Sequence, residues 1–310
     1  MKKALLIFLT IALLVGARAQ QVPQYTHYIF NYFALNPAFA GSGDCLDVRM
    51  GYRTQWVGFD GAPRTAFANF HTPLKFKKSK NVYTKHGVGL HVHSDNIGPF
   101  GSTQVLGAYA YHFPVNQRVK ASFGVFGGIE QFRFNASRIT LANYDDAAIA
   151  ASASAFLFPK VTPGFHLEGE KWFAGASIHE LLRNRWKVLE NSRKGWQYHL
   201  LYGQRIKGRK KLDLIASGLF KCGPFATPAL DLNLMGEYDK TLSVGLSWRN
   251  TDAIAAIFKV KFKQYFALGY AFDFTTSRIR YGSSNTHEVI LSIYTCAKSK
   301  YASFQCPAYF

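Results

Sequence analysis

Few side chains in this chain of 310 residues have the types and spacing that chemistry requires. His91 and His93, with His86 shortly before them, form a His-x-His pair. Two imidazoles at this spacing lie on one face of a strand, where they could ligate a metal ion. Polar residues that line a water-filled interior give the same pattern, and we prefer this interpretation. The sequence therefore predicts no metal site.

Candidate acid and base groups are equally sparse. Asp145, Asp146, Glu180 and Glu190 lie in segments that we expect to be loops, where their geometry is not fixed by spacing. The chain contains no GxSxG, HExxH or phosphate-binding loop motif. We expect a protein that is not an enzyme and that has no cofactor.

The first residues have the features of a secretory leader. Lys2 and Lys3 precede an apolar run, and Ala17-Arg18-Ala19 supplies a small-residue cleavage site. The apolar run is too short for a permanent membrane span. We predict that residues 1–19 are a signal peptide and that the chain is exported.

The composition adds two observations, a basic charge and many aromatic residues. The formal net charge is +19, and 27 Phe, 17 Tyr and 5 Trp make up 16% of the residues. A basic exported protein fits an acidic partner or anionic lipid headgroups better than nucleic acid. After the leader, no apolar run reaches the length of a membrane helix, so an embedded chain would have to form a closed β-barrel.

Alternation with a period of two is the main structural signal. In TLSVGLSWRN, residues 241–250, apolar side chains alternate with polar or small ones, and LDVRMGYRTQW (46–56) and PALDLNLMGEY (228–238) repeat the pattern. A soluble sandwich buries such an apolar face, whereas an outer-membrane barrel presents it to lipid and lines its lumen with the polar face. Export, length and aromatic content favour the barrel.

We predict an all-β fold, a closed antiparallel transmembrane β-barrel of about fourteen strands, with a short N-terminal periplasmic or luminal plug segment. The expected strands lie near residues 46–57, 65–74, 86–93, 102–113, 118–133, 160–167, 170–180, 196–206, 211–220, 228–238, 241–250, 253–261, 263–274 and 286–295. An even number is usual for bacterial single-chain barrels. The connections after even-numbered strands are mostly short and several of those after odd-numbered strands are long, as expected if both termini are periplasmic. The basic stretch 75–85 and the tight turn at 250–252 are exceptions.

The predicted organisation has four parts: a signal peptide at 1–19, a plug or docking segment at 20–44, the outer-membrane barrel at 45–296 and a C-terminal periplasmic tail at 297–310. The second part contains QQVPQYTHYIFNYFALNPAFAG, which is rich in aromatic residues and poor in charge. Its aromatic side chains would surround a short helix that Asn36-Pro37 ends. We expect a luminal plug or a periplasmic docking arm, with Tyr25, Tyr28, Phe30, Asn36 and Pro37 as candidate partner-binding residues.

Basic residues gather in the predicted periplasmic connections. Candidate partner-binding residues are Lys77, Lys78 and Lys80 in one connection and Arg209 and Lys210 in another. Lys259, Lys261 and Lys263 lie around a third connection. Such a rim either holds anionic outer-membrane lipid headgroups or docks an acidic protein face.

The four cysteines permit a disulfide in an oxidising compartment. Barrel closure would bring Cys45, before the first strand, close to Cys296, after the last one, and Cys306 competes on the same side. Cys222 is expected in an external loop on the opposite side. We predict a Cys45–Cys296 or Cys45–Cys306 bridge, with free thiols as the alternative.

Three sequence blocks, in this order, resemble the PorP/SprF family of the type IX secretion system of Bacteroidetes: NPAFAG near residues 36–41, QWVGFDGAP at 55–63 and YAFDFTTS at 270–277. The resemblance spans nearly the whole chain after the leader. The family usually has Tyr where this chain has Phe39, and the cysteines are not part of its pattern.

The resemblance implies an outer-membrane barrel that works with a periplasmic ring lipoprotein and the partner of that lipoprotein in the ring. Its role would be to support secretion or surface anchoring of cargo with C-terminal sorting domains, which in some members includes gliding adhesins. The alternative function is an outer-membrane porin or substrate-specific channel. A soluble secreted sandwich is a third possibility.

Overall fold

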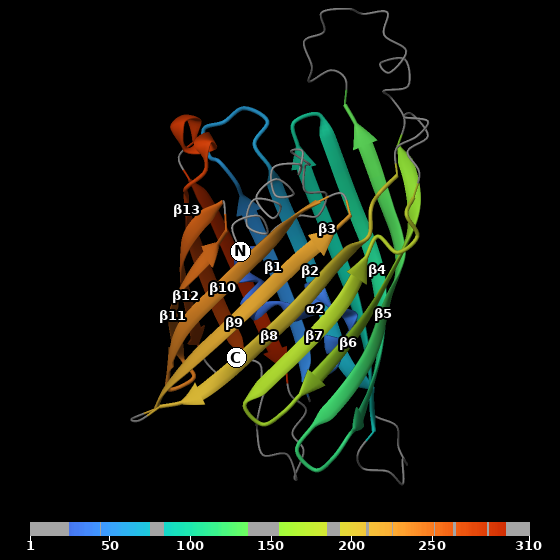
Figure 1. Cartoon of the computed structure of the whole chain (residues 1–310), viewed down its shortest axis with the longest axis vertical. Helices are drawn as coiled ribbons and strands as arrows, with labels where there is room; N and C mark the ends of the chain where they lie inside the picture. Colours follow the sequence, from blue (N-terminus) through green and yellow to red (C-terminus); the bar gives the residue numbers. More distant parts are fainter. Residues whose placement is uncertain are drawn as a thin grey trace, which may run out of the picture.

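The described part of the chain forms a closed barrel of fourteen antiparallel strands (Figure 1). This computed structural model describes residues 25–43, 45–74, 84–135, 155–184, 193–208, 211–224, 226–250, 252–262, 265–283 and 285–295. Each strand pairs with its neighbours in sequence, and the first strand pairs with the last to close the barrel. The predicted fold is confirmed. No helix among the described residues has the length and apolar character of a membrane span.

The strand bounds agree closely with the period-two segments. The strands are β1 (Leu46–Thr54), β2 (Arg64–Leu74), β3 (Lys85–Ile97), β4 (Phe100–Pro114), β5 (Lys120–Phe134), β6 (Phe156–Glu168), β7 (Trp172–His179), β8 (Gln197–Lys207), β9 (Leu212–Gly223), β10 (Ala226–Tyr238), β11 (Leu242–Arg249), β12 (Ala253–Phe262), β13 (Phe266–Thr275) and β14 (Thr286–Thr295). We call the end at which β1 begins the lower rim and the opposite end the upper rim, as oriented in Figure 1.

The apolar face of each strand lies outside. In β11, Val244 and Leu246 are 54% and 63% exposed, whereas Ser243 and Ser247 on the other face are buried. A soluble sandwich would reverse this arrangement, because its apolar face would form the core. The exposed apolar belt therefore requires a lipid environment, and the polar face lines the lumen.

The lumen is occupied by the chain itself. Residues 25–43, which we call the luminal segment, form three short helical turns, η1 (Thr26–Phe30), α2 (Tyr32–Leu35) and η2 (Pro37–Phe39), and almost all of their side chains are buried. Figure 1 shows α2 inside the barrel. The expectation of a single short helix was wrong, because Asn31 and Asn36 leave the helical conformation with φ of −147° and −149°. Asn36 also caps η2, since its Oδ1 accepts from Ala38 N at 2.9 Å.

Glycines in the wall leave room for the backbone of the luminal segment. A Cβ atom added to Gly124 of β5 would collide with Ala38 N, and one added to Gly87 of β3 would collide with Ala40 O. At Gly164 of β6, it would collide with Asn36 Oδ1. These positions need glycine because the segment approaches the wall closely, with its backbone at Gly87 and Gly124 and with the Asn36 side chain at Gly164.

The described cysteines differ in state. Cys45 is disulfide-bonded, and Cys222 is a free thiol. Cys296 and Cys306 lie outside the described residues, so the partner of Cys45 stays a prediction. Cys222 does not lie in a loop as expected, because β9 continues to Gly223 and pairs Cys222 with Tyr198 of β8.

We predict that Gly124→Ala destabilises the barrel by about 1–3 kcal/mol, since the new methyl group overpacks a filled interior. Gly127→Ala is the matched control on the same strand, because a Cβ there has nothing within 4 Å, and its effect should stay within about 0.5 kcal/mol. Urea unfolding of the refolded barrel, followed by tryptophan fluorescence, measures both. Equal effects of the two substitutions would show that the luminal segment does not press on the wall.

Candidate functional site

The candidate site is the filled lumen, and its first element is an ion-pair network at the seam where β1 meets β14. Arg53 Nη1 lies 2.9 Å from Glu288 Oε2, and Arg53 Nη2 lies 2.8 Å from Asp273 Oδ2. Thr26 N donates to Glu288 at 2.7 Å, and Thr26 Oγ1 donates to Asp273 at 2.8 Å. All four side chains are buried. Because buried charges need partners, this network fixes the start of the luminal segment to three strands.

A second buried arginine widens the network toward β10 and β11. Arg249 Nε lies 3.4 Å from Asp231 and its Nη1 lies 3.0 Å from Asp252, and Lys221 Nζ lies 2.9 Å from Asp231. Arg249 Nη2 also donates to Thr26 Oγ1 at 3.3 Å. The first turn of the luminal segment therefore contacts charges from strands on both sides of the seam.

Neutral polar groups hold the middle of the segment. Asn233 of β10 donates to the hydroxyl of Tyr28, and burial raises the pKa of Tyr28 well above its usual value, so the hydroxyl stays protonated. Asn36 Nδ2 donates to Phe165 O at 2.9 Å and to Ala176 O at 3.2 Å, between β6 and β7. These contacts lie across the lumen from the seam, so the segment spans the barrel.

The end of the segment is held at the lower rim. Lys85 Nζ donates to the carbonyl oxygens of Ser42 and Gly43, both at 2.7 Å, and the His112 ring bonds Ala40 O at 2.8 Å. Lysine donors here satisfy backbone carbonyls that would otherwise be buried without partners. The segment then enters β1 directly.

Lys259 also contacts the luminal segment. Its ammonium lies 4.2 Å from the centre of the Phe30 ring, a cation–π geometry, and the side chain is buried. Lys259 was grouped with the basic residues around a periplasmic connection, but its side chain faces the lumen. It lies within β12, where odd-numbered residues face the lumen.

A second charge cluster lies inside the barrel, next to β5, β6 and β7. Lys160 Nζ lies 2.6 Å from Glu180 and 3.4 Å from Glu130, and Lys194 Nζ lies 2.5 Å from Glu130 and 3.8 Å from Glu180. The charges of the two ammonium groups and the two carboxylates thus cancel. Glu180, a candidate acid or base in the sequence, is buried and paired with lysines rather than placed in an exposed loop. Asp145, Asp146 and Glu190 lie outside the described residues.

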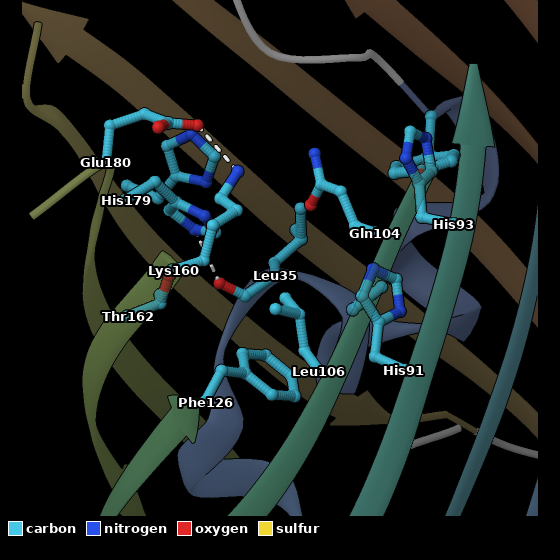
Figure 2. A pocket seen from close by; sticks show the side chains of 13 residues that line it. Leu35, His91, His93, Gln104, Leu106, Phe126, Lys160, Thr162, His179 and Glu180 are labelled. Atoms are coloured by element: carbon cyan, nitrogen blue, oxygen red, sulfur yellow. Dashed lines mark hydrogen bonds and ion pairs between the residues drawn. The ribbon is translucent and has the colours of Figure 1, made fainter. Parts of the chain in front are cut away.

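A small cavity of about 40 Å³ lies between the luminal segment and the wall (Figure 2). Its lining includes Tyr25, Leu35, His91, His93, Gln104, Lys160, His179, Glu180 and His199. His86 lies on the opposite face of β3 and bonds the Tyr109 hydroxyl at 2.6 Å. Within the described ranges, no group of three or more His, Cys, Asp or Glu side chains is arranged to hold a metal ion.

The structure places the predicted partner-binding residues in two different situations. Tyr25, Tyr28, Phe30, Asn36 and Pro37 lie in the lumen and contact the barrel wall. The basic candidates Lys77, Lys78, Lys80, Arg209 and Lys210 lie outside the described residues. The acidic partners of Arg53 were missed, and the only signal for them was a charge at a lumen-facing position of a period-two strand.

Exposed charges at the lower rim are mainly basic in the described turns and strand ends. The exposed basic residues there are Arg118, Lys120, Lys171, Lys207, Lys211 and Lys240, and the exposed acidic ones are Glu170 and Asp239. Lys211 and Asp239 pair with each other at 2.9 Å on the surface. The described rim therefore presents a positive field.

Several solved outer-membrane proteins share this fold. The monoaromatic hydrocarbon channel CymD has a TM-score of 0.51 and 9% identity, over 93% of this chain and 96% of CymD. The toluene transporter TbuX of Ralstonia pickettii has a TM-score of 0.52 and 8% identity, over 91% of this chain and 96% of TbuX. The toluene transporter TodX of P. putida has a TM-score of 0.50 and 8% identity, over 85% and 93%. At this identity, the likeness concerns the fold alone.

The sequence comparison identifies the family. A search of curated protein sequences found no significant match. The profile of the family described as "Type IX secretion system membrane protein PorP/SprF" matches residues 17–293, which include the luminal segment and nearly all of the barrel. This chain, an outer-membrane β-barrel whose lumen holds its own N-terminal residues, therefore belongs to the PorP/SprF family of type IX secretion system membrane proteins.

Proposed function

We propose that this protein is a sealed outer-membrane barrel that anchors and docks other components of the type IX secretion system. The observation that carries this proposal is the luminal segment, which is buried and held at the seam, across the lumen and at the lower rim. A diffusion channel needs a continuous aqueous path. Here that path is filled by aromatic side chains such as Tyr32 and Phe33.

The partners follow from the orientation of the barrel. We place the lower rim and both chain termini in the periplasm, after removal of residues 1–19. The positive rim then faces the periplasmic ring, and an acidic face of the ring lipoprotein or of its ring partner complements it. Cargo with a C-terminal sorting domain is the secreted partner, and gliding adhesins are among the cargos in this proposal.

A channel remains the second candidate because solved barrels of this fold include proteins described as a hydrocarbon channel and toluene transporters. Such a function would require the luminal segment to move. Thr26 of the segment donates hydrogen bonds to the buried carboxylates of Glu288 and Asp273, and each hydrogen bond to a charged group contributes about 1.5–3 kcal/mol. The sealed state is therefore favoured.

We predict that deletion of residues 22–40 converts the barrel into an ion-conducting pore, because the deletion removes most of the luminal segment. The full chain should show no stable conductance in planar lipid bilayers. Deletion of residues 136–154, which has the same length and lies between β5 and β6, is the matched control and should stay closed. Heat-dependent mobility in gel electrophoresis checks that each barrel has folded. Conductance of the full chain would favour the channel instead.

We predict that charge reversal at the lower rim weakens ring docking. The variant with Lys171, Lys207 and Lys240 replaced by Glu should recover ring lipoprotein at least about tenfold less well in co-purification, because each exposed ion pair contributes up to about 1 kcal/mol. Replacement of Lys77, Lys78 and Lys80 by Glu tests the basic connection between β2 and β3 in the same way.

The matched control for charge reversal lies at the other end of the barrel. Arg64, Arg193 and Arg280 are exposed at the upper rim, and their replacement by Glu changes the net charge equally. This variant should retain the ring lipoprotein. If both triple variants insert normally and bind the ring as the unmodified chain does, the rim holds lipid headgroups and not a protein.

A further inference from the structure

We propose that His91 and His93 form a binding site for one divalent transition-metal ion, such as Zn²⁺ or Cu²⁺, in the cavity between the luminal segment and the wall. The site goes beyond the proposed docking function and does not depend on it. Its two protein ligands come from one strand, and water completes the coordination. Figure 2 shows both imidazoles on β3, on the side of the strand that faces the cavity.

The geometry of the pair suits a shared ion. His91 and His93 lie two residues apart on β3, both face the lumen, and their ring centres are 6.1 Å apart with planes 18° from parallel. Because a Zn–N bond is about 2 Å long, two imidazoles on one ion have ring centres roughly 5–6 Å apart. Because the rings are nearly parallel, their lone pairs meet on one ion only after one ring has turned.

His91 is oriented as a metal ligand would be. Asn69 Nδ2 donates to Asn31 Oδ1 at 2.7 Å, which turns the Asn69 carbonyl oxygen toward His91 Nδ1 at 2.5 Å. The Nδ1–H of His91 therefore donates to Asn69, and the lone pair on Nε2 is left for a cation. Metal-ligating histidines are commonly fixed by such a hydrogen bond from the other ring nitrogen. Since Asn31 belongs to the luminal segment, the segment itself orients this ligand.

His93 supplies the independent observation. Its side chain is only 2% exposed, yet neither ring nitrogen has a hydrogen-bond partner among the described residues. Tyr25 packs edge-on against the ring, with centres 5.9 Å apart, and leaves it beside the cavity. Buried polar groups in native proteins are nearly always paired, so an unpaired imidazole at a cavity calls for a ligand. With no hydrogen bond to break, His93 is also the ring that can rotate.

The cavity has the volume that a small hydrated cation needs. A buried water occupies about 10–15 Å³ on this measure, so the volume of about 40 Å³ accommodates an ion with one or two waters. The amide of Gln104 lines the same space. Lys160 lines the same cavity, and the charges of Lys160 and Lys194 are neutralised by Glu130 and Glu180.

The ligand set selects the class of ion. Imidazole nitrogen suits Zn²⁺, Cu²⁺ and Ni²⁺, whereas Ca²⁺ and Mg²⁺ prefer oxygen ligands. Two protein ligands give a site weaker than a structural zinc centre, which has four. A cavity that holds only water is the competing explanation.

The test uses the full mature chain without a histidine tag, refolded in detergent and stripped with chelator. Titration with Zn²⁺ by calorimetry should show one saturable ion per chain. With Cu²⁺, electron paramagnetic resonance should show two nitrogen ligands. Either His91→Ala or His93→Ala should abolish saturable binding, and Asn69→Ala should weaken it by about 10–100-fold, because the orienting hydrogen bond is lost.

His86→Ala is the matched control, since His86 lies on the same strand but on its outer face. It should bind Zn²⁺ as the unmodified chain does. A Zn²⁺-dependent rise in the unfolding temperature of the unmodified chain, absent in His93→Gln, tests the site even if the alanine variants fold poorly. The proposal is wrong if the unmodified chain binds no ion, in which case the cavity holds water, or if loss of His91 and His93 leaves binding unchanged. Neither outcome affects the conductance or the ring recovery, so the docking function is tested separately.

Discussion

Ion pairing at the barrel seam is the interaction on which the closed lumen depends. Arg53 on β1 meets Asp273 on β13 and Glu288 on β14, and the backbone of Thr26 adds a donor to the same carboxylate. None of these charges reaches solvent, so each one requires the others. The same contacts join the first strand to the last two and hold the luminal segment against them. The same group of side chains therefore both closes the barrel wall and holds the luminal segment in the lumen.

The molecule reverses the usual distribution of polarity, with apolar side chains outside and a polar lining within. The polar groups of that lining need hydrogen-bond partners, and a narrow barrel has little room for water to supply them. The luminal segment supplies partners by bringing its own backbone donors, asparagine side chains and aromatic rings to the polar wall. Glycines such as Gly87 and Gly124 let its backbone approach closely. The result, in the described part of the chain, is an interior that is packed like a protein core.

The features that follow from local rules were predictable from the sequence. Strand number, closure and the outward apolar face all derive from the period of two, as β11 illustrates. The predictions that failed concern features whose conformation is set by contacts between residues far apart in the sequence. The luminal segment was expected to form one helix, but the contacts of Asn31 and Asn36 with the wall divide it into three turns. The contact of Lys259 with Phe30 was not predicted, because it depends on the luminal segment being in the lumen. No sequence pattern showed that Asp273 and Glu288 would meet Thr26.

The seam contacts also constrain the order of assembly. Thr26 bonds Glu288, a residue 262 positions later in the chain, so its anchor does not exist until the final hairpin has been made. A segment threaded into the lumen after the wall had closed would have to pass charged groups already paired across the interior. We therefore expect the luminal segment to lie against the unclosed sheet while the later strands are added. The last strand then completes the hydrogen-bonding of the first strand and the burial of the N-terminal residues in the same step. Contacts between the two ends of a chain form slowly, so the pairing of β1 with β14 is expected to be a slow step in the folding of this barrel.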